Sequence, residues 1–312
     1  MRATLAGITL TALLAAGSVG AGERPQGGGR PARRHLADAP RGNWAQLGWL
    51  GTENPCNIEQ VDLLSVAMFR ELFKGRKPVV FRAGDGAFRN ETTRQALLAE
   101  YGSIDVTLSS SNSFSAGRMD TTLGDYIESF MMEQGPDSRA NESWYLFGDT
   151  RGPEWLRLQS QYQPPLDGPL DDPAVSLGLG GLGSGVSFHT HGPAFAETVH
   201  GSKRWFLSPP ARRPDFHPNE SSVAWVHNRW LPAFIRQCPM ASASPAACAT
   251  LDESGWRSPV DMLECTVPAG SAIYIPDGWW HATLNMGDWN VFVSTFTHEP
   301  PTEREDPRGE EL

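Results

Sequence analysis

Two histidines two positions apart are the residues of this sequence best suited to chemistry. His189 and His191 stand in the stretch SGVSFHTHGP, residues 184–193. Side chains two apart on a strand point to the same face, so both imidazoles can reach one ion. His281, in PDGWWHATLN, follows a tight turn and begins another predicted strand. The three histidines therefore predict a metal site, although imidazole suits iron, zinc, copper and nickel alike.

The elements that must position these histidines are short strands. Helical patterns begin at Asn57, Asn90 and Thr122 and end at Gly75, Tyr101 and Gly135. From Glu142 onward, short segments rich in β-branched and aromatic residues alternate with Gly, Pro and Asn, and one helical insert covers residues 222–236. This order predicts a mainly β jelly-roll barrel with N-terminal helices and a helical insert.

The N-terminus reads as a signal peptide over residues 1–21. Arg2 precedes an apolar run, Ala3–Ala16, and small residues follow it. The run is shorter than the roughly 20 residues of a membrane span, and an uncleaved anchor is the alternative. We expect a flexible linker over 22–45, one domain over 46–298 and a disordered acidic tail over 299–312. After cleavage we expect no membrane insertion.

Three sequons and four cysteines agree with a secretory route. The sequons predict glycosylation at Asn90, Asn141 and Asn219. No two cysteines form a C-x-x-C pair, so structural disulfides are favoured over zinc or redox chemistry. Of the three pairings that four cysteines allow, we predict the one that closes a short loop, with free thiols as the alternative. The predicted bonds are Cys238–Cys248 and Cys56–Cys265.

The charge of the chain bears on its partners. Among 312 residues, 36 are acidic and 26 are Lys or Arg, a formal net charge of −10. Phosphates would repel such a chain, which argues against nucleic acid as a general partner. Given the secretory route indicated above, we expect luminal or secretory proteins as partners, and no nucleic acid.

Longer motifs carry a family resemblance. The spacing Gly183-x5-His189-x-His191 resembles the first cupin motif, and Gly270-x5-Pro276-x-Gly278-x2-His281-x3-Asn285 matches the second. The stretches KPVVFRAG, GSGVSFHTHGPAFAETVHGSKRWFLSPP and AIYIPDGWWHATLNMGDWNVFVSTF resemble a jumonji-C (JmjC) domain, and more closely the JmjC domain-containing protein 8 family. The likeness covers about residues 49–297. It implies a double-stranded β-helix and residence in the lumen of the endoplasmic reticulum, with secretion as the alternative.

The resemblance also implies ligands. JmjC enzymes hold Fe(II) with two histidines and a carboxylate and bind 2-oxoglutarate beside it. His189 and His281 match the histidines, whereas His191 stands where the carboxylate belongs. The acidic residue of the first motif is one position too far along, at Glu197. Lys203 matches the residue that binds the distal carboxylate of 2-oxoglutarate.

Other residues are candidates for the same pocket. Arg204 would replace Lys203 if the register were shifted by one residue. Tyr274, Thr295 and Asn285 are further candidates to line the pocket or to orient a ligand histidine. Val186 stands where many relatives place a hydroxyl, and it cannot supply one.

Three functions follow as hypotheses. The favoured one is a luminal JmjC-domain protein with a divergent metal site that works through protein contacts, with weak or no oxygenase activity. A second is an Fe(II)- and 2-oxoglutarate-dependent dioxygenase that hydroxylates proteins of the secretory pathway. A third is a three-histidine cupin oxidase independent of 2-oxoglutarate, which would not need Lys203.

Overall fold

The structure is a computed structural model that describes residues 50, 56–83, 86–148, 152–166, 173–237 and 257–297. All of them belong to one compact unit, Arg34–Leu312. The predicted signal peptide, linker and acidic tail lie outside the described residues, as do Cys238 and Cys248. Within the described ranges, none of the helices has the length and apolar character that a membrane crossing requires.

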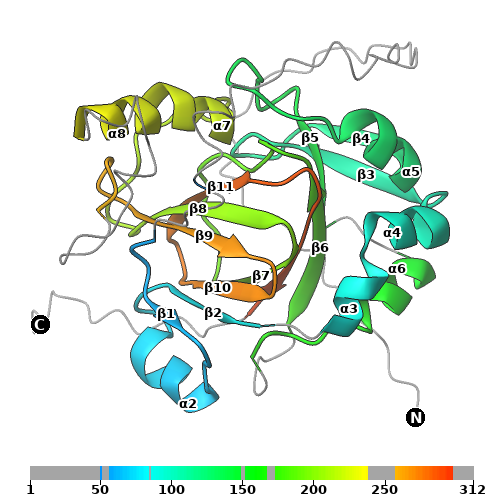
Figure 1. The fold of residues 1–312 in the computed structure, drawn as a ribbon, viewed down its shortest axis with the longest axis horizontal. Helices are drawn as coiled ribbons and strands as arrows, with labels where there is room; N and C mark the ends of the chain where they lie inside the picture. The colour runs from blue at the N-terminus through cyan, green and yellow to red at the C-terminus, as the bar shows by residue number, and fades with distance from the viewer. Residues whose placement is uncertain are drawn as a thin grey trace, which may run out of the picture. The chain divides into compact units, whose positions relative to one another are not determined.

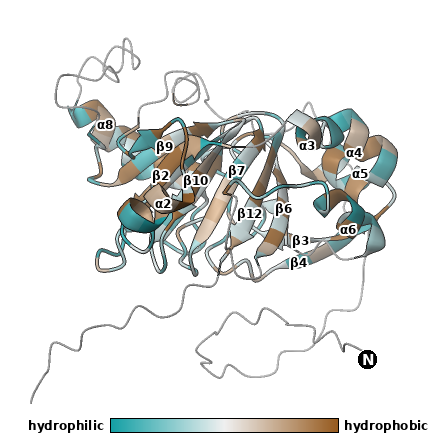
Figure 2. Cartoon of the chain, turned by 90° about the horizontal axis from the view of Figure 1, so that it is seen from below, coloured by the Kyte–Doolittle hydropathy of each residue, from teal (hydrophilic) through white to brown (hydrophobic). Residues whose placement is uncertain are grey.

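The described strands form two sheets (Figure 1). The large sheet has the order β1 (Gln60–Val61), β2 (Val79–Arg82), β10 (Ser271–Ile275), β7 (Ala194–His200), β12 (Asn290–Phe296), β6 (Ala174–Gly180), β5 (Trp144–Phe147), β3 (Asp105–Ser110) and β4 (Arg118–Thr122). The small sheet has the order β11 (Trp280–Asn285), β8 (Ser202–Ser208) and β9 (Leu263–Pro268). Figure 2 shows β10, β7, β12 and β6 side by side. The mainly β jelly roll is confirmed.

Apolar side chains from the two sheets pack against each other. Trp205 and Leu207 of β8 meet Ile273 and Ile275 of β10 in one buried cluster. Since alternate residues of a strand point to opposite faces, these residues mark the faces that the two sheets turn toward each other. The predicted disulfide Cys56–Cys265 lies in the same cluster and is confirmed.

Helices cover the other faces. The insert, α7 (Ser222–Trp225), η5 (Val226–Trp230) and α8 (Leu231–Gln237), packs on the far side of the small sheet (Figure 1). On the far side of the large sheet, one cluster holds residues of α3 (Gly86–Glu91), α4 (Arg94–Tyr101), α5 (Leu123–Asp125), η4 (Tyr126–Phe130) and α6 (Pro153–Gln159). A second holds residues of α2 (Val66–Met68) and η3 (Phe69–Phe73). Helices thus cover the outer faces of both sheets.

The first predicted helix begins later than its sequence pattern indicates. Ser65, not Asn57, caps it, with its hydroxyl accepting from the backbone NH of Met68. The Asn57 amide instead bonds to β9, donating to the carbonyl of Met262 and accepting from the NH of Glu264. An asparagine satisfied by a distant strand cannot cap a local helix, which is why the N-cap prediction was wrong.

The second predicted helix is two helices. Thr93 caps α4 by accepting from the NH of Ala96, while the hydroxyl of Thr92 donates to the carbonyl of Phe88 and ends α3. Two adjacent threonines that prefer backbone partners therefore break the pattern between residues 90 and 101. The third helix begins at the predicted cap, Thr122, but ends at Met131 rather than Gly135.

The predicted glycosylation sites differ in exposure. Asn90 and Asn141 are exposed. Asn219 is half-buried, and its side-chain oxygen is among the fully buried polar atoms of the described residues. A glycan attached to the folded chain would therefore meet less steric hindrance at the first two sites, and glycosylation itself stays a prediction.

Candidate metal centre

Backbone hydrogen bonds bring the two histidine segments together. The NH of Asn285 donates to the carbonyl of Ser184, and that of Thr283 to the carbonyl of Val186. His189 and His281 exchange two such bonds of 3.0 Å. Residues 183–189 thus run antiparallel to β11, and the first and second histidine motifs become neighbours.

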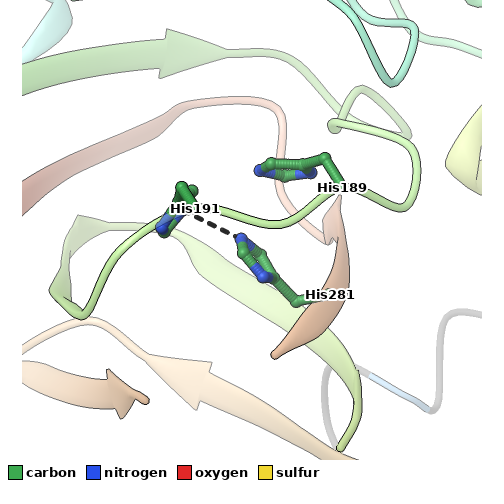
Figure 3. Close-up of side chains that lie close together, drawn as sticks. All are labelled: His189, His191 and His281. Carbon is green, nitrogen blue, oxygen red and sulfur yellow. Dashed lines mark hydrogen bonds between the residues drawn. The ribbon is translucent and has the colours of Figure 1, made fainter. Parts of the chain in front are cut away.

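The three predicted ligands converge. The available ligand atoms of His189, His191 and His281 all lie within 4.8 Å of one another. Figure 3 shows the imidazoles turned toward one another, with the Nε2 atoms of His191 and His281 only 3.0 Å apart. His281 is buried, while His189 and His191 are half-buried.

Backbone carbonyls fix the protonation of each ring. Nδ1 of His189 lies 2.8 Å from the carbonyl oxygen of Ser187, and Nδ1 of His281 lies 2.9 Å from that of Trp279. For His191 the partner is the carbonyl of Gly192, at 2.6 Å. A carbonyl oxygen only accepts, so each Nδ1 carries the proton and each Nε2 presents a lone pair. Outer hydrogen bonds of this kind orient metal-binding histidines.

Two lone pairs 3.0 Å apart repel each other unless a cation lies between them. A proton on either Nε2 would make that ring a cation or break its Nδ1 hydrogen bond. A metal ion satisfies both, because at a metal–nitrogen distance of roughly 2.1 Å two ligands at a right angle lie about 3.0 Å apart. The donor set therefore fits a divalent transition metal.

The electrostatics of the cluster keep the imidazoles neutral. Burial, followed by the charge of His191, lowers the pKa of His189 to about 3. Burial also lowers the pKa of His281 well below its usual value. For His191, burial lowers the pKa, while the Gly192 carbonyl and the charge of Asp277 oppose the shift. Neutral imidazole is the form that binds metal, so at neutral pH no proton needs to be displaced.

Lys203 is turned toward the same interior. Lys203, Trp205 and Leu207 are two positions apart along β8 and therefore share one face. The indole of Trp205 lies 5.9 Å from the imidazole of His281. The Lys203 side chain is buried, and burial lowers its pKa from 10.5 to about 7. Among the described residues no acidic side chain forms an ion pair with it. A buried amine without an acidic partner fits a carboxylate ligand.

Arg204 points the other way. Its guanidinium donates to Glu264 Oε2 at 2.7 Å, and both side chains are fully buried on the helix-covered face of the small sheet. The alternative register, in which Arg204 faces the histidines, is therefore excluded.

Two predicted pocket residues are not brought to the histidines, contrary to the sequence prediction. The hydroxyl of Tyr274 accepts from the NH of Gly75, and its ring packs against Phe69 on the far face of the large sheet. Thr295 is fully buried next to Phe296 in β12, and the Phe296 ring lies 5.1 Å from that of His191. Because neighbouring residues of a strand point to opposite faces, Thr295 faces away.

Glu197 does not join the histidines either. Its carboxylate is buried and accepts from the hydroxyl of Tyr162 at 3.0 Å. Glu197 is the direct neighbour of Ala196, which packs on the interior face. Adjacent residues of a strand point to opposite faces, so Glu197 lies on the opposite face of β7. No carboxylate is among the clustered ligand groups in the described part of the chain.

Sequence reasoning missed Phe292 and Phe296. Phe292 lies under the Lys203 amine, 3.5 Å from Nζ to the ring centroid, and Phe296 flanks His191. Their spacing of four along β12 places both on one face, which the alternating stretch NVFVSTF signals. Which face that is depends on pairing with β7, a long-range contact.

Replacing His281 by alanine is expected to lower metal affinity by more than about 100-fold. Loss of a group that merely orients a ligand already costs 10–100-fold, and His281 would be a ligand itself. Titration with Co²⁺, followed by its visible absorption, measures the change. His217→Ala is the matched control, because His217 is exposed and lies outside the cluster. Equal affinities for the two variants would rule out this centre.

Comparison with known proteins agrees with this geometry. A family model described as a cupin-like domain matches residues 65–303. The chain is 39% identical over 270 residues to JmjC domain-containing protein 8 of Rattus norvegicus, covering 84% of this chain and 91% of the relative. The Homo sapiens protein of that name is 37% identical over 292 residues, covering 93% and 97%. A lysine-specific demethylase of Arabidopsis thaliana is 28% identical over 272 residues, covering 78% of this chain and 26% of the relative. The chain therefore belongs to the cupin-like domain family and, within it, to the JmjC domain-containing protein 8 family.

Proposed function

We propose that this chain is a luminal, metal-binding JmjC-domain protein that regulates other proteins by contact and has weak or no oxygenase activity. The observation that carries the proposal is the donor set: three neutral imidazoles converge, and no carboxylate joins them among the described residues. A metal held by these residues would have surroundings that differ from those that JmjC oxygenases use.

The charge at the metal is the physical reason why we expect weak oxygenase activity. A carboxylate ligand cancels one unit of the metal's charge, whereas a third imidazole leaves the full dication. Iron in such a site is a poorer electron donor toward oxygen. Val186 removes a further interaction, because it offers no hydroxyl to a co-substrate.

The luminal location is supported by features that suit an oxidising compartment. Cys56 and Cys265 form a disulfide, a bond that is rare in reducing cytosol. The chain also begins with a signal-like segment and carries three sequons, of which Asn90 and Asn141 are exposed.

A second function is favoured by one specific observation, the buried Lys203. An Fe(II)- and 2-oxoglutarate-dependent protein hydroxylase needs a cation that takes the distal carboxylate of 2-oxoglutarate, and Lys203 supplies one. His189, His191 and His281 would hold the iron, which would supply oxygen activation. A three-histidine oxidase that does not use 2-oxoglutarate would leave Lys203 without a role.

Anaerobic titration of 2-oxoglutarate into Fe(II)-loaded protein tests whether Lys203 binds this co-substrate. Lys203→Ala is the test variant, and Lys77→Ala, at a half-exposed lysine, is the matched control. We expect saturable binding that weakens at least about tenfold in Lys203→Ala only, the typical effect of losing a charged hydrogen bond. Absence of binding to iron-loaded wild-type protein would exclude the 2-oxoglutarate-dependent hydroxylase and leave regulation by protein contact.

His191→Asp then tests whether the histidine in place of a carboxylate causes the weak oxygenase activity. Under the proposal, succinate formation from 2-oxoglutarate is low in the wild-type protein and rises in the variant, because the restored carboxylate cancels one charge. A fall in succinate formation would contradict the proposal and identify His191 as a working ligand of an active hydroxylase.

A further inference from the structure

The side chain of Asn285 joins Lys203 to the segment that leads into His189. Its Oδ1 accepts from Lys203 Nζ at 3.3 Å, and its Nδ2 donates to Ser184 Oγ at 2.9 Å. Asn285 is itself the last residue of β11, the strand that carries His281. One buried amide thus connects the predicted anion-binding residue to both metal-binding segments.

The orientation of this amide follows from its partners. Ser184 Oγ donates its proton to the carbonyl of Gly181 at 2.6 Å, so it can only accept from Asn285. The amide therefore turns its NH₂ group to Ser184 and its oxygen to Lys203, whose ammonium only donates.

Packing leaves the amide little freedom to turn. Asn285 and Ser184 are both buried. A Cβ at Gly180 would lie 2.4 Å from Asn285 Nδ2 and 2.6 Å from Ser184 Oγ. Glycine at position 180 is therefore required for this arrangement, and the backbone bonds of Asn285 to Gly183 and Ser184 fix the amide further.

Lys203 has a second contact that favours its charged form. The ring of Phe292 lies under the amine, with Nζ 3.5 Å from the ring centroid. Burial acts in the opposite direction and lowers the pKa of Lys203 to about 7. His189 and His281 are the titratable groups on which the Lys203 charge acts, and both stay neutral at that pH.

We infer that Asn285 is a positioning residue that holds the Lys203 amine toward the barrel interior and leaves its charge available to a carboxylate ligand. An amide suits this task because its oxygen orients the amine without neutralising it. An aspartate in its place would form an internal ion pair and compete with the ligand. The identity of that ligand as 2-oxoglutarate rests on the proposed function; the role of Asn285 toward Lys203 does not.

The amine can be observed directly, because the chain contains only three lysines, Lys74, Lys77 and Lys203. In protein labelled with ¹³C at lysine Cε, the three signals are assigned with Lys203→Ala and Lys77→Ala. We expect the Lys203 signal of wild-type protein to titrate near pH 7. Asn285→Asp should move this titration up by at least about one pH unit, since an opposite charge at contact favours the protonated amine. Asn285→Leu should move it down.

A merely structural role would not produce shifts of opposite sign in these two variants. Shifts of the same sign, or none, would overturn the inference. Co²⁺ binding serves as the folding control, because Asn285 does not contact the histidines and a folded variant retains the centre.

The ligand arm uses 2-oxoglutarate with Fe(II)-loaded protein at pH 7. We expect Asn285→Asp to weaken binding at least about tenfold, because the aspartate already occupies the amine. Equal binding by wild-type protein and Asn285→Asp would overturn the inference. If wild-type protein does not bind 2-oxoglutarate, the co-substrate assignment fails, and the titration of Lys203 still decides the role of Asn285.

Discussion

Replacing Glu264 by alanine is expected to lower the free energy of unfolding by about 3–5 kcal/mol. Glu264 Oε2 accepts from Arg204 Nη2 at 2.7 Å and from Trp230 Nε1 at 2.9 Å. Both charged side chains are fully buried, so alanine would remove from the core the carboxylate that pairs with the Arg204 guanidinium. Urea denaturation followed by circular dichroism measures the loss.

The matched control is an ion pair at the surface. Glu59 accepts from Lys77 at 2.5 Å, but both side chains are nearly half exposed. Glu59→Ala should therefore change the free energy of unfolding by less than about 1 kcal/mol. A similar loss of stability in the two variants would contradict the prediction that burial makes the Arg204–Glu264 pair the more important one.

Replacing both Cys56 and Cys265 by alanine is expected to lower the free energy of unfolding by about 2–5 kcal/mol. The disulfide joins residues 209 positions apart, so it restricts the unfolded chain strongly. It also fastens Asn57, which bonds to Met262 and Glu264, to the edge of the small sheet. Denaturation of the oxidised wild-type protein and the double variant measures the difference.

A second readout reports on the metal centre. Cys265 pairs in register with Trp205, whose indole lies 5.9 Å from the His281 imidazole. We expect the free energy of Co²⁺ binding to change less than the free energy of unfolding, because the backbone hydrogen bonds between His189 and His281 remain. If the free energy of unfolding falls by less than about 1 kcal/mol, the disulfide restricts neither the folded nor the unfolded chain appreciably.

Much of the fold followed from local patterns. Short alternating segments predicted the strands that carry His281 and Lys203, because the side-chain period of a strand depends only on the strand itself. The disulfide Cys56–Cys265 was predicted as the pair that remains once Cys238 and Cys248 are assigned to a short loop. The start of the first helix could not be predicted correctly, since the Asn57 amide bonds to Met262 and Glu264, more than 200 residues away, and Ser65 caps the helix instead.

The sequence by itself determined which residues are candidates for chemistry: His189, His191 and His281 from their spacing, and Lys203 from the family resemblance. The tertiary structure decided which way each side chain faces. Tyr274 and Thr295 are each adjacent in sequence to a residue on the interior face. A shift of one residue along a strand turns a side chain to the opposite face. That register is set by pairing between distant strands and by packing against helices. For the same reason, only the folded chain shows that Asn285 contacts Lys203 rather than a histidine.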